Sequence, residues 1–130
     1  MSRLLRSAPY LPVADVDATV AYYESVLGFR AAYVAGEPAV FAIVGRDEQT
    51  LMFRRVEAPG LIRPSEAQGD TWDAFYWTDD ADSLHAELLA AGAEIAYGPV
   101  IQDDYSMKEF AVRDPDGHVL GFGEDVAPPS

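Results

Sequence analysis

The sequence contains no cysteine, which excludes disulfide bonds, thiolate chemistry and the cysteine-based zinc sites of many small domains. Basic residues are also scarce: nine Lys and Arg stand against 22 Asp and Glu, for a formal net charge of -13. Because phosphate binding requires clustered Lys and Arg, we expect no nucleic acid partner. The acidity indicates a well-solvated surface, and the alternative interpretation is attraction of a cationic ligand.

No apolar run approaches membrane-spanning length, and Met1 to Ser7 has only two leucines between Arg3 and Arg6, too short a core for a signal peptide. We therefore expect a cytoplasmic protein with no membrane partner. Glycine-rich phosphate loops are absent as well. At 130 residues the chain predicts a single domain with a real core, too small for two independent domains.

One pattern occurs twice along the chain. Leu11 to Asp17 opens a helical run that ends at Gly28, and Tyr76 to Asp82 opens another that ends at Gly92. The two segments align at an offset of 65 residues, which falls to 64 at the glycines. Such a repeat predicts two copies of one structural unit that share a domain.

Each predicted helix has a start signal, an apolar stripe and a stop signal. Asp15 and Asp80 are placed to cap the first free amides, and the glycines at 28 and 92 allow a left-handed residue at the end. The stripes recur at helical spacing and consist of Val16, Val20, Tyr23 and Leu27 in the first copy and Ala81, Leu84, Leu88 and Ala91 in the second.

Strand-like runs surround the helices, at Leu4–Leu11, Ala31–Val34, Val40–Val44 and Thr50–Val56, then at Trp72–Trp77, Glu94–Val100, Phe110–Val112 and His118–Phe122. The order strand, helix, three strands predicts an α+β protein of two βαβββ modules, at 1–57 and 71–125, joined by a loop at 58–70. Asp114 to Gly117 is typical of a tight turn between two strands. Residues 126–130 are predicted to be a frayed tail.

These features carry a resemblance. The paired modules, the segment from Leu11 to Phe29 and the segment Glu109-Phe-Ala-Val-Arg-Asp-Pro-Asp-Gly-His118 resemble the vicinal oxygen chelate superfamily of glyoxalases, bleomycin resistance proteins and dioxygenases. Within it the chain is most similar to the metal-free bleomycin resistance group. The resemblance implies curved mixed sheets that form a cup-shaped ligand site.

In the enzymes that the chain resembles, a His or Gln, a second His and a Glu hold a divalent ion. Aligned by the two motifs, these positions fall on Ala8, Asp73 and Gly121, of which only Asp73 has a donor atom. Because a catalytic metal normally needs about three protein ligands, we expect no metal and no cofactor. His118 is expected at a turn edge, on the face opposite Gly121, and His85 half-buried on a helix.

Strand alternation predicts the lining of a metal-free cup. It places Asp73, Phe75 and Trp77 on one face and Trp72, Ala74 and Tyr76 on the other, and the parity of the aligned metal position assigns the first set to the cup. The same argument adds Ala8, Tyr10 and Pro12. Phe41 is a weaker candidate, and the resemblance implies an aromatic role for Tyr105. The predicted ligand-binding residues are thus Tyr10, Phe41, Asp73, Phe75, Trp77 and Tyr105.

An aromatic slot edged by carboxylates suits a flat, partly cationic molecule. For Phe75 and Trp77 the competing interpretation is simple core packing. The predicted function is metal-free binding and sequestration of an aromatic or cationic small molecule by a homodimer, without catalytic residues. The alternatives are a lyase, isomerase or dioxygenase of the same superfamily with an unusual site, or a ligand-binding module with a regulatory or carrier role.

Overall fold

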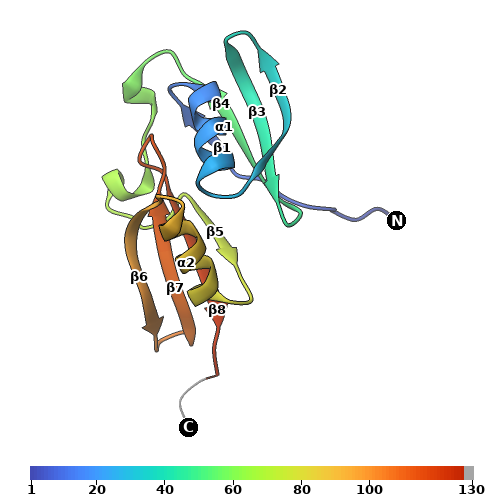
Figure 1. Cartoon of the computed structure of the whole chain (residues 1–130). Coiled ribbons are helices and arrows are strands. Elements are labelled where there is room, and N and C mark those ends of the chain that lie inside the picture. The colour runs from blue at the N-terminus through green and yellow to red at the C-terminus, as the bar shows by residue number, and fades with distance from the viewer. Residues whose placement is uncertain (128–130) are drawn as a thin grey trace. The chain divides into compact units, whose positions relative to one another are not determined.

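The chain folds into two units, Met1–Arg63 (unit 1) and the residues from Pro64 onward (unit 2), each with one sheet and one helix (Figure 1). The computed structural model describes residues 1–127, so residues 128–130 of the predicted tail lie outside the described part. Unit 1 contains β1 (Tyr10–Val13), α1 (Val16–Ser25), β2 (Arg30–Gly36), β3 (Ala39–Arg46), β4 (Gln49–Arg55) and the 3-10 turn η1 (Pro59–Leu61). Unit 2 contains η2 (Ser65–Gln68), β5 (Ala74–Trp77), α2 (Ala81–Ala90), β6 (Glu94–Gln102), β7 (Met107–Arg113) and β8 (Val119–Asp125).

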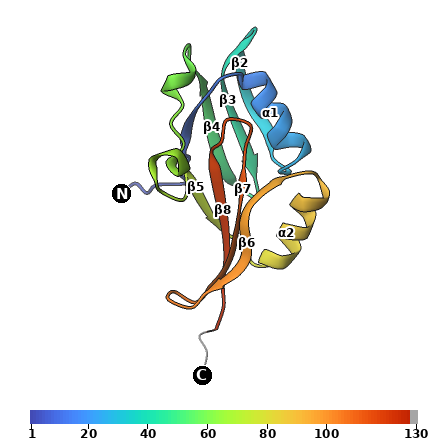
Figure 2. The same ribbon diagram turned by 90° about the vertical axis from the view of Figure 1, so that its left-hand side faces the viewer.

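Both sheets have the same mixed topology. Their strand orders are β1-β4-β3-β2 and β5-β8-β7-β6, with one parallel pair in each sheet, β1 with β4 and β5 with β8. Within each unit the helix lies along one face of its own sheet (Figures 1 and 2). The predicted α+β fold with two βαβββ modules is confirmed. None of the helices in residues 1–127 is long and apolar enough to cross a membrane.

The helix boundaries follow the predicted capping signals. Asp15 accepts a hydrogen bond from the backbone N–H of Ala18, and Asp80 accepts one from that of Ser83, both at 3.0 Å. Gly28 and Gly92 have φ angles of 76° and 100°, the left-handed conformation that ends each helical run. The apolar stripes are buried, apart from half-buried Leu84 and exposed Ala91.

Two predicted strands begin later than expected. The run from Leu4 forms no strand before Tyr10, because Leu4 and Leu5 are exposed and have no packing to stabilise an extended segment. The fifth strand begins at Ala74, so Trp72 and Asp73 precede it. Alternation across the sheet therefore does not govern these two side chains, which changes the predicted site.

The helix α2 covers one face of the unit 2 sheet, and the two faces carry different side chains. On the covered face the ring of His85 lies 5.3 Å from that of Phe110, and Lys108 pairs with Asp82 at 2.6 Å. The opposite face carries the side chains that alternate with these. We call it the aromatic face of unit 2, and it holds the candidate site.

Candidate functional site

The strand register of unit 2 defines two rows of side chains on the aromatic face. The first row crosses the sheet through Phe75, Gly121, Ala111 and Tyr97. The second row crosses it through Trp77, Gly123, Glu109 and Val100. In both rows the β8 position is a glycine. The outer strands therefore supply aromatic side chains, while the central strand next to β5 supplies only backbone.

The two glycines make room for the rings that flank them. A Cβ atom on Gly121 would lie 2.6 Å from Cδ2 of Phe75 and 2.6 Å from Nε1 of Trp72. A Cβ atom on Gly123 would lie 2.7 Å from Cζ of Phe75 and would collide with the sulfur of Met107. Because real Cβ contacts are never this short, the rings occupy the space that β8 side chains would need. They rest directly on the strand backbone.

The rings form one connected group. The ring centroids of Trp72 and Phe75 are 4.7 Å apart, and those of Phe75 and Trp77 are 5.1 Å apart in an edge-to-face arrangement. The indole N–H of Trp72 donates to the hydroxyl of Tyr97 at 2.9 Å. With Tyr105, described below, these residues form the aromatic cluster: Trp72, Phe75, Trp77, Tyr97 and Tyr105.

The prediction from strand alternation that Trp72 lies on the face opposite Phe75 was therefore wrong. Trp72 lies beside Phe75, not on the opposite face with Ala74 and Tyr76, because it precedes β5 and its side chain is free to turn. Within the strand the alternation holds. Tyr76 stacks on Phe122 on the helix-covered face, with ring centroids 6.0 Å apart.

Glu109 is the charged member of the site. Its residue is only 1% exposed, and its Oε1 accepts a hydrogen bond of 2.6 Å from the hydroxyl of Tyr105. Its Oε2 is buried and has no hydrogen-bond partner. Among residues 1–127, no lysine, arginine or histidine forms an ion pair with it. The site thus contains a buried carboxylate with one vacant acceptor.

The two tyrosines beside Glu109 hold their protons strongly. Loss of hydration and then the hydrogen bond to Glu109 raise the pKa of Tyr105 from 10.0 to about 12. Burial raises the pKa of Tyr97, the hydrogen bond from Trp72 opposes this shift, and the charge of Glu109 and a hydrogen bond to its carboxylate add to it. Both side chains are neutral hydrogen-bond donors at physiological pH.

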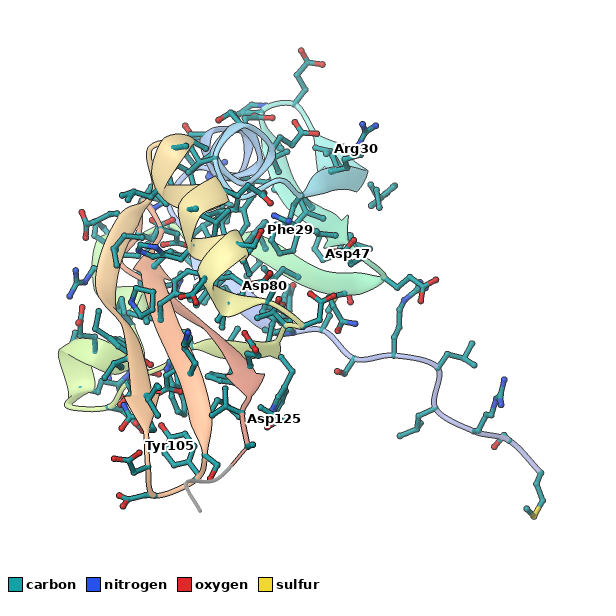
Figure 3. The ribbon with its side chains drawn as sticks, turned by 60° about the horizontal axis from the view of Figure 1, so that its bottom comes forward. Phe29, Arg30, Asp47, Asp80, Tyr105 and Asp125 are labelled. Atoms are coloured by element: carbon teal, nitrogen blue, oxygen red, sulfur yellow. The ribbon has the colours of Figure 1, made fainter. Side chains whose placement is uncertain are left out.

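The edge of the aromatic cluster is accessible to solvent. Trp77 is 67% exposed and Tyr105 is 49% exposed, whereas Phe75 and Tyr97 behind them are half-buried. Figure 3 shows Tyr105 in the turn between β6 and β7, at the end of the sheet where Asp125 closes β8. Trp77 is therefore not a core residue, and the competing interpretation of simple core packing is wrong for this position.

Asp73 is bound by its own chain. Its Oδ1 accepts hydrogen bonds from the backbone N–H and the hydroxyl of Ser65, at 2.9 and 3.0 Å, and its Oδ2 accepts one of 2.8 Å from the N–H of Val119. The sequence predicted a ligand-binding carboxylate here, and the structure gives both of its oxygens partners within the chain. These bonds tie the start of η2 and the start of β8 to β5.

Unit 1 brings Tyr10 and Phe41 together, as the sequence suggested, with ring centroids 6.1 Å apart. Tyr33 lies at the same distance from Phe41, and the guanidinium of Arg54 sits 5.3 Å above the Tyr10 ring. Nη1 of Arg54 is buried without a hydrogen-bond partner. The corresponding face of unit 1 therefore combines aromatic rings with a cation, where unit 2 combines them with an anion.

Both histidines lie against other side chains of unit 2. His85 packs against Phe110 on the helix-covered face, the half-buried helix position that was predicted. His118 is fully buried and its Nδ1 lies 3.7 Å from Oδ1 of Asp73, so it is more enclosed than the predicted turn edge. The turn itself is confirmed by the hydrogen bond of 3.0 Å from Gly117 N–H to the carbonyl of Asp114.

A family model described as the Glyoxalase/Bleomycin resistance protein/Dioxygenase superfamily matches residues 4–122. The chain belongs to this superfamily. Virulence protein STM3117 of Salmonella typhimurium is 29% identical over 119 residues, which cover 89% of this chain and 81% of the relative. Metallothiol transferase FosB of Shouchella clausii is 31% identical over 109 residues, 83% of this chain and 71% of the relative.

A solved structure also matches nearly the whole of this chain. It is the crystal structure of a bleomycin-binding protein from bleomycin-producing Streptomyces verticillus, complexed with copper(II)-bleomycin. The match has a TM-score of 0.68 and 26% sequence identity, and covers 99% of this chain and 100% of that chain. The proteins that this chain is similar to include both a transferase and a binding protein, so the superfamily contains members that catalyse reactions and members that bind ligands.

The residues of this chain do not fit a metal centre at the positions that the resemblance implies. Ala8 has no donor atom, the space beside Gly121 is filled by Phe75 and Trp72, and both oxygens of Asp73 are already bound. Over residues 1–127, no group of three or more His, Asp or Glu side chains is arranged to hold a metal ion.

Three members of the site were missed by sequence reasoning: Trp72, Tyr97 and Glu109. Glu109 stands in a quoted motif, and in the structure it begins the continuous buried run of β7 that continues to Val112. Its place directly before the apolar residues Phe110 to Val112 is the signal that sequence reasoning could have used. Tyr97 carried no comparable signal, because the irregular pairing of β6 shifts its register.

Proposed function

We propose that the protein binds and sequesters an aromatic or cationic small molecule on the aromatic face of unit 2, without a metal. The observation that carries the proposal is the combination of exposed Trp77 and Tyr105 with the buried carboxylate of Glu109. A purely structural surface has no need of large exposed rings around a buried charge.

The physical chemistry favours a flat ligand. Each stacked aromatic pair contributes about 0.5 to 1.5 kcal/mol beyond the burial of its area. Rings backed by glycine present their faces and edges to a ligand over a continuous surface, with Trp77 at the accessible end. The copper(II)-bleomycin bound to the Streptomyces verticillus protein supports a ligand of this kind, and bleomycin is therefore the first compound to test.

Intrinsic fluorescence offers a direct test, because both tryptophans of the protein belong to the aromatic cluster. We expect bleomycin, or another aromatic cation from a screened panel, to change the tryptophan emission and to raise the melting temperature. Isothermal titration calorimetry then gives the affinity. Replacing Trp77 with Ala is expected to weaken binding by about 1 to 3 kcal/mol with little loss of stability.

The matched control is Leu89→Ala. Leu89 is an exposed apolar residue of unit 2 on α2, away from the aromatic face, so its removal is expected to leave affinity unchanged. Binding that persists at full strength in Trp77→Ala would place the ligand elsewhere in the protein. A Trp77→Ala variant that unfolds, with a loss of about 3 to 5 kcal/mol, would instead identify Trp77 as core.

A further inference from the structure

We propose that Glu109 selects the charge of the ligand by pairing with a cationic nitrogen group, such as an amidinium, guanidinium or ammonium. This inference rests on the proposed function and deepens it by naming the residue that recognises the ligand's charge. Neither the sequence motifs nor the family resemblance assigns this role to β7. It follows from the surroundings of a single carboxylate.

The first argument is the incomplete pairing of Glu109. Its Oε2 is buried without a hydrogen-bond partner, and the donors around the carboxylate are the neutral hydroxyls of Tyr105 and Tyr97. A buried carboxylate normally has a cation or several donors, because its removal from water costs several kcal/mol that neutral hydroxyl donors offset only in part. A ligand that brings a positive charge and an N–H donor supplies both missing elements.

Other acidic side chains of unit 2 show what a satisfied carboxylate looks like in this fold. Asp73 accepts three hydrogen bonds from the chain. Glu66 accepts two from the guanidinium of Arg113, at 2.7 and 2.8 Å, which lowers the pKa of that carboxyl. Glu109 is more deeply buried than Glu66, and its Oε2 accepts no hydrogen bond, whereas both oxygens of Asp73 and of Glu66 accept at least one.

The second argument is the position of Glu109 within the aromatic cluster. Glu109 and Trp77 occupy the same row of the sheet, with only Gly123 between them, and Tyr97 lies close enough for the Glu109 charge to raise its pKa. Cations bind favourably within about 6 Å of an aromatic ring face. A carboxylate surrounded by rings therefore selects a cation that is joined to a flat apolar group.

Tyr105 controls access to this carboxylate. Its hydroxyl occupies Oε1 of Glu109, and its side chain is half-exposed in the turn between β6 and β7 (Figure 3). The internal hydroxyl and an incoming N–H donor compete for the same anion. Removing only the hydroxyl, as in Tyr105→Phe, leaves the ring in place and removes the hydrogen bond to Oε1 of Glu109, which favours binding of a cation.

Benzamidine and benzamide form a suitable pair of probes, since they have nearly the same shape and differ in charge. Binding of each to the full chain is measured by NMR titration of the two tryptophan indole N–H signals, both of which arise from the aromatic cluster. The test variant is Glu109→Gln, which keeps the shape of the side chain. The matched control is Glu94→Gln, which makes the same change at an exposed residue of unit 2 that pairs with Arg113.

We expect the wild-type protein to bind benzamidine more tightly than benzamide. Glu109→Gln is expected to weaken benzamidine binding at least about tenfold, the effect of losing a hydrogen bond between charged groups, and to change benzamide binding less than about twofold. Glu94→Gln should leave both affinities unchanged. Tyr105→Phe should strengthen benzamidine binding about 2- to 10-fold, as one competing neutral hydrogen bond is lost.

The outcomes separate this inference from the proposed function. If both probes bind equally well and Glu109→Gln changes neither affinity, the aromatic face binds ligands and the role of Glu109 is wrong. If neither probe nor bleomycin shifts the indole signals of the wild-type protein, the proposed function fails and the inference fails with it. Should Glu109→Gln not fold, Tyr105→Phe decides, and no gain in benzamidine affinity refutes the proposal.

Discussion

Gly121→Ala tests whether the aromatic rings rest on the backbone of β8. The change adds one methyl group at a strand position, where alanine is otherwise at least as acceptable as glycine. The new Cβ would lie 2.6 Å from both Cδ2 of Phe75 and Nε1 of Trp72. Trp72 must then move outward and lose its hydrogen bond to Tyr97, and Phe75 must leave its position over the strand.

The expected cost is that of overpacking. Inserting a methyl group into a well-packed site typically destabilises a protein by about 1 to 3 kcal/mol, and this range applies here because one of the two rings is partly exposed and able to shift. Gly60→Ala is the matched control, since a Cβ atom at Gly60 meets nothing within 4 Å. Its free energy of unfolding is expected to stay unchanged or to rise by up to about 1 kcal/mol.

Urea denaturation followed by circular dichroism measures both changes, and tryptophan emission reports whether the rings have moved. A double variant with Phe75→Leu provides a further check, because a smaller residue at 75 should recover part of the loss and reveal coupling between the two positions. If Gly121→Ala unfolds at the same urea concentration as the wild-type protein and its emission is unchanged, the contact between the rings and β8 does not exist.

Four further results are expected. Because folding raises the pKa of Tyr105 from 10.0 to about 12, its contribution to stability is complete below pH 10 and is lost as the pH rises through 12. The ultraviolet absorbance of tyrosinate should show this late ionisation, and Tyr105→Phe should lower its amplitude by one tyrosine, because burial also raises the pKa of Tyr76 and Tyr97. Asp73→Ala leaves three donors without an acceptor and should cost about 2 to 4 kcal/mol in urea denaturation. Zinc, nickel, manganese or iron salts should not raise the melting temperature of the wild-type protein, and stoichiometric binding of one ion that Asp73→Ala abolishes would contradict this. We also expect a homodimer, because each sheet has two edge strands that a second chain can cover, and sedimentation velocity showing a ligand-binding monomer at micromolar concentration would refute this.

Local signals in the sequence determine most of the fold. Asp15 and Asp80 cap their helices as predicted, and the glycines at 28 and 92 end the helical runs. These features depend on residues that are close together in the chain, so one sequence suffices to recognise them. The superfamily resemblance is likewise confirmed, because the family model matches residues 4–122, and the quoted motifs include the cap at Asp15 and the turn at Asp114.

The site was harder to predict because it depends on contacts between distant residues. Asp73 accepts a hydrogen bond from Val119, 46 positions away, so the carboxylate that was predicted to bind a ligand is bound within the chain. Trp72 joins the cluster because the strand begins two residues later than the apolar run. The predicted sharing of one face by Phe75 and Trp77 is confirmed, whereas the ligand-binding roles of these residues and of Tyr105 stay predictions. Glu109, whose carboxylate accepts the hydrogen bond from Tyr105, is placed beside them only by the register of β7 and β8.

The alternation of side chains across the unit 2 sheet separates stability from specificity. Residues that hold α2 in place, such as Phe110 and Phe122, point to one face, while Trp77 and Glu109 belong to the other. Substitutions on the aromatic face therefore leave the packing of the helix intact. Trp77 and Tyr105, the exposed residues of this face, are therefore the positions where a library of variants is expected to change the proposed ligand binding while the fold is retained.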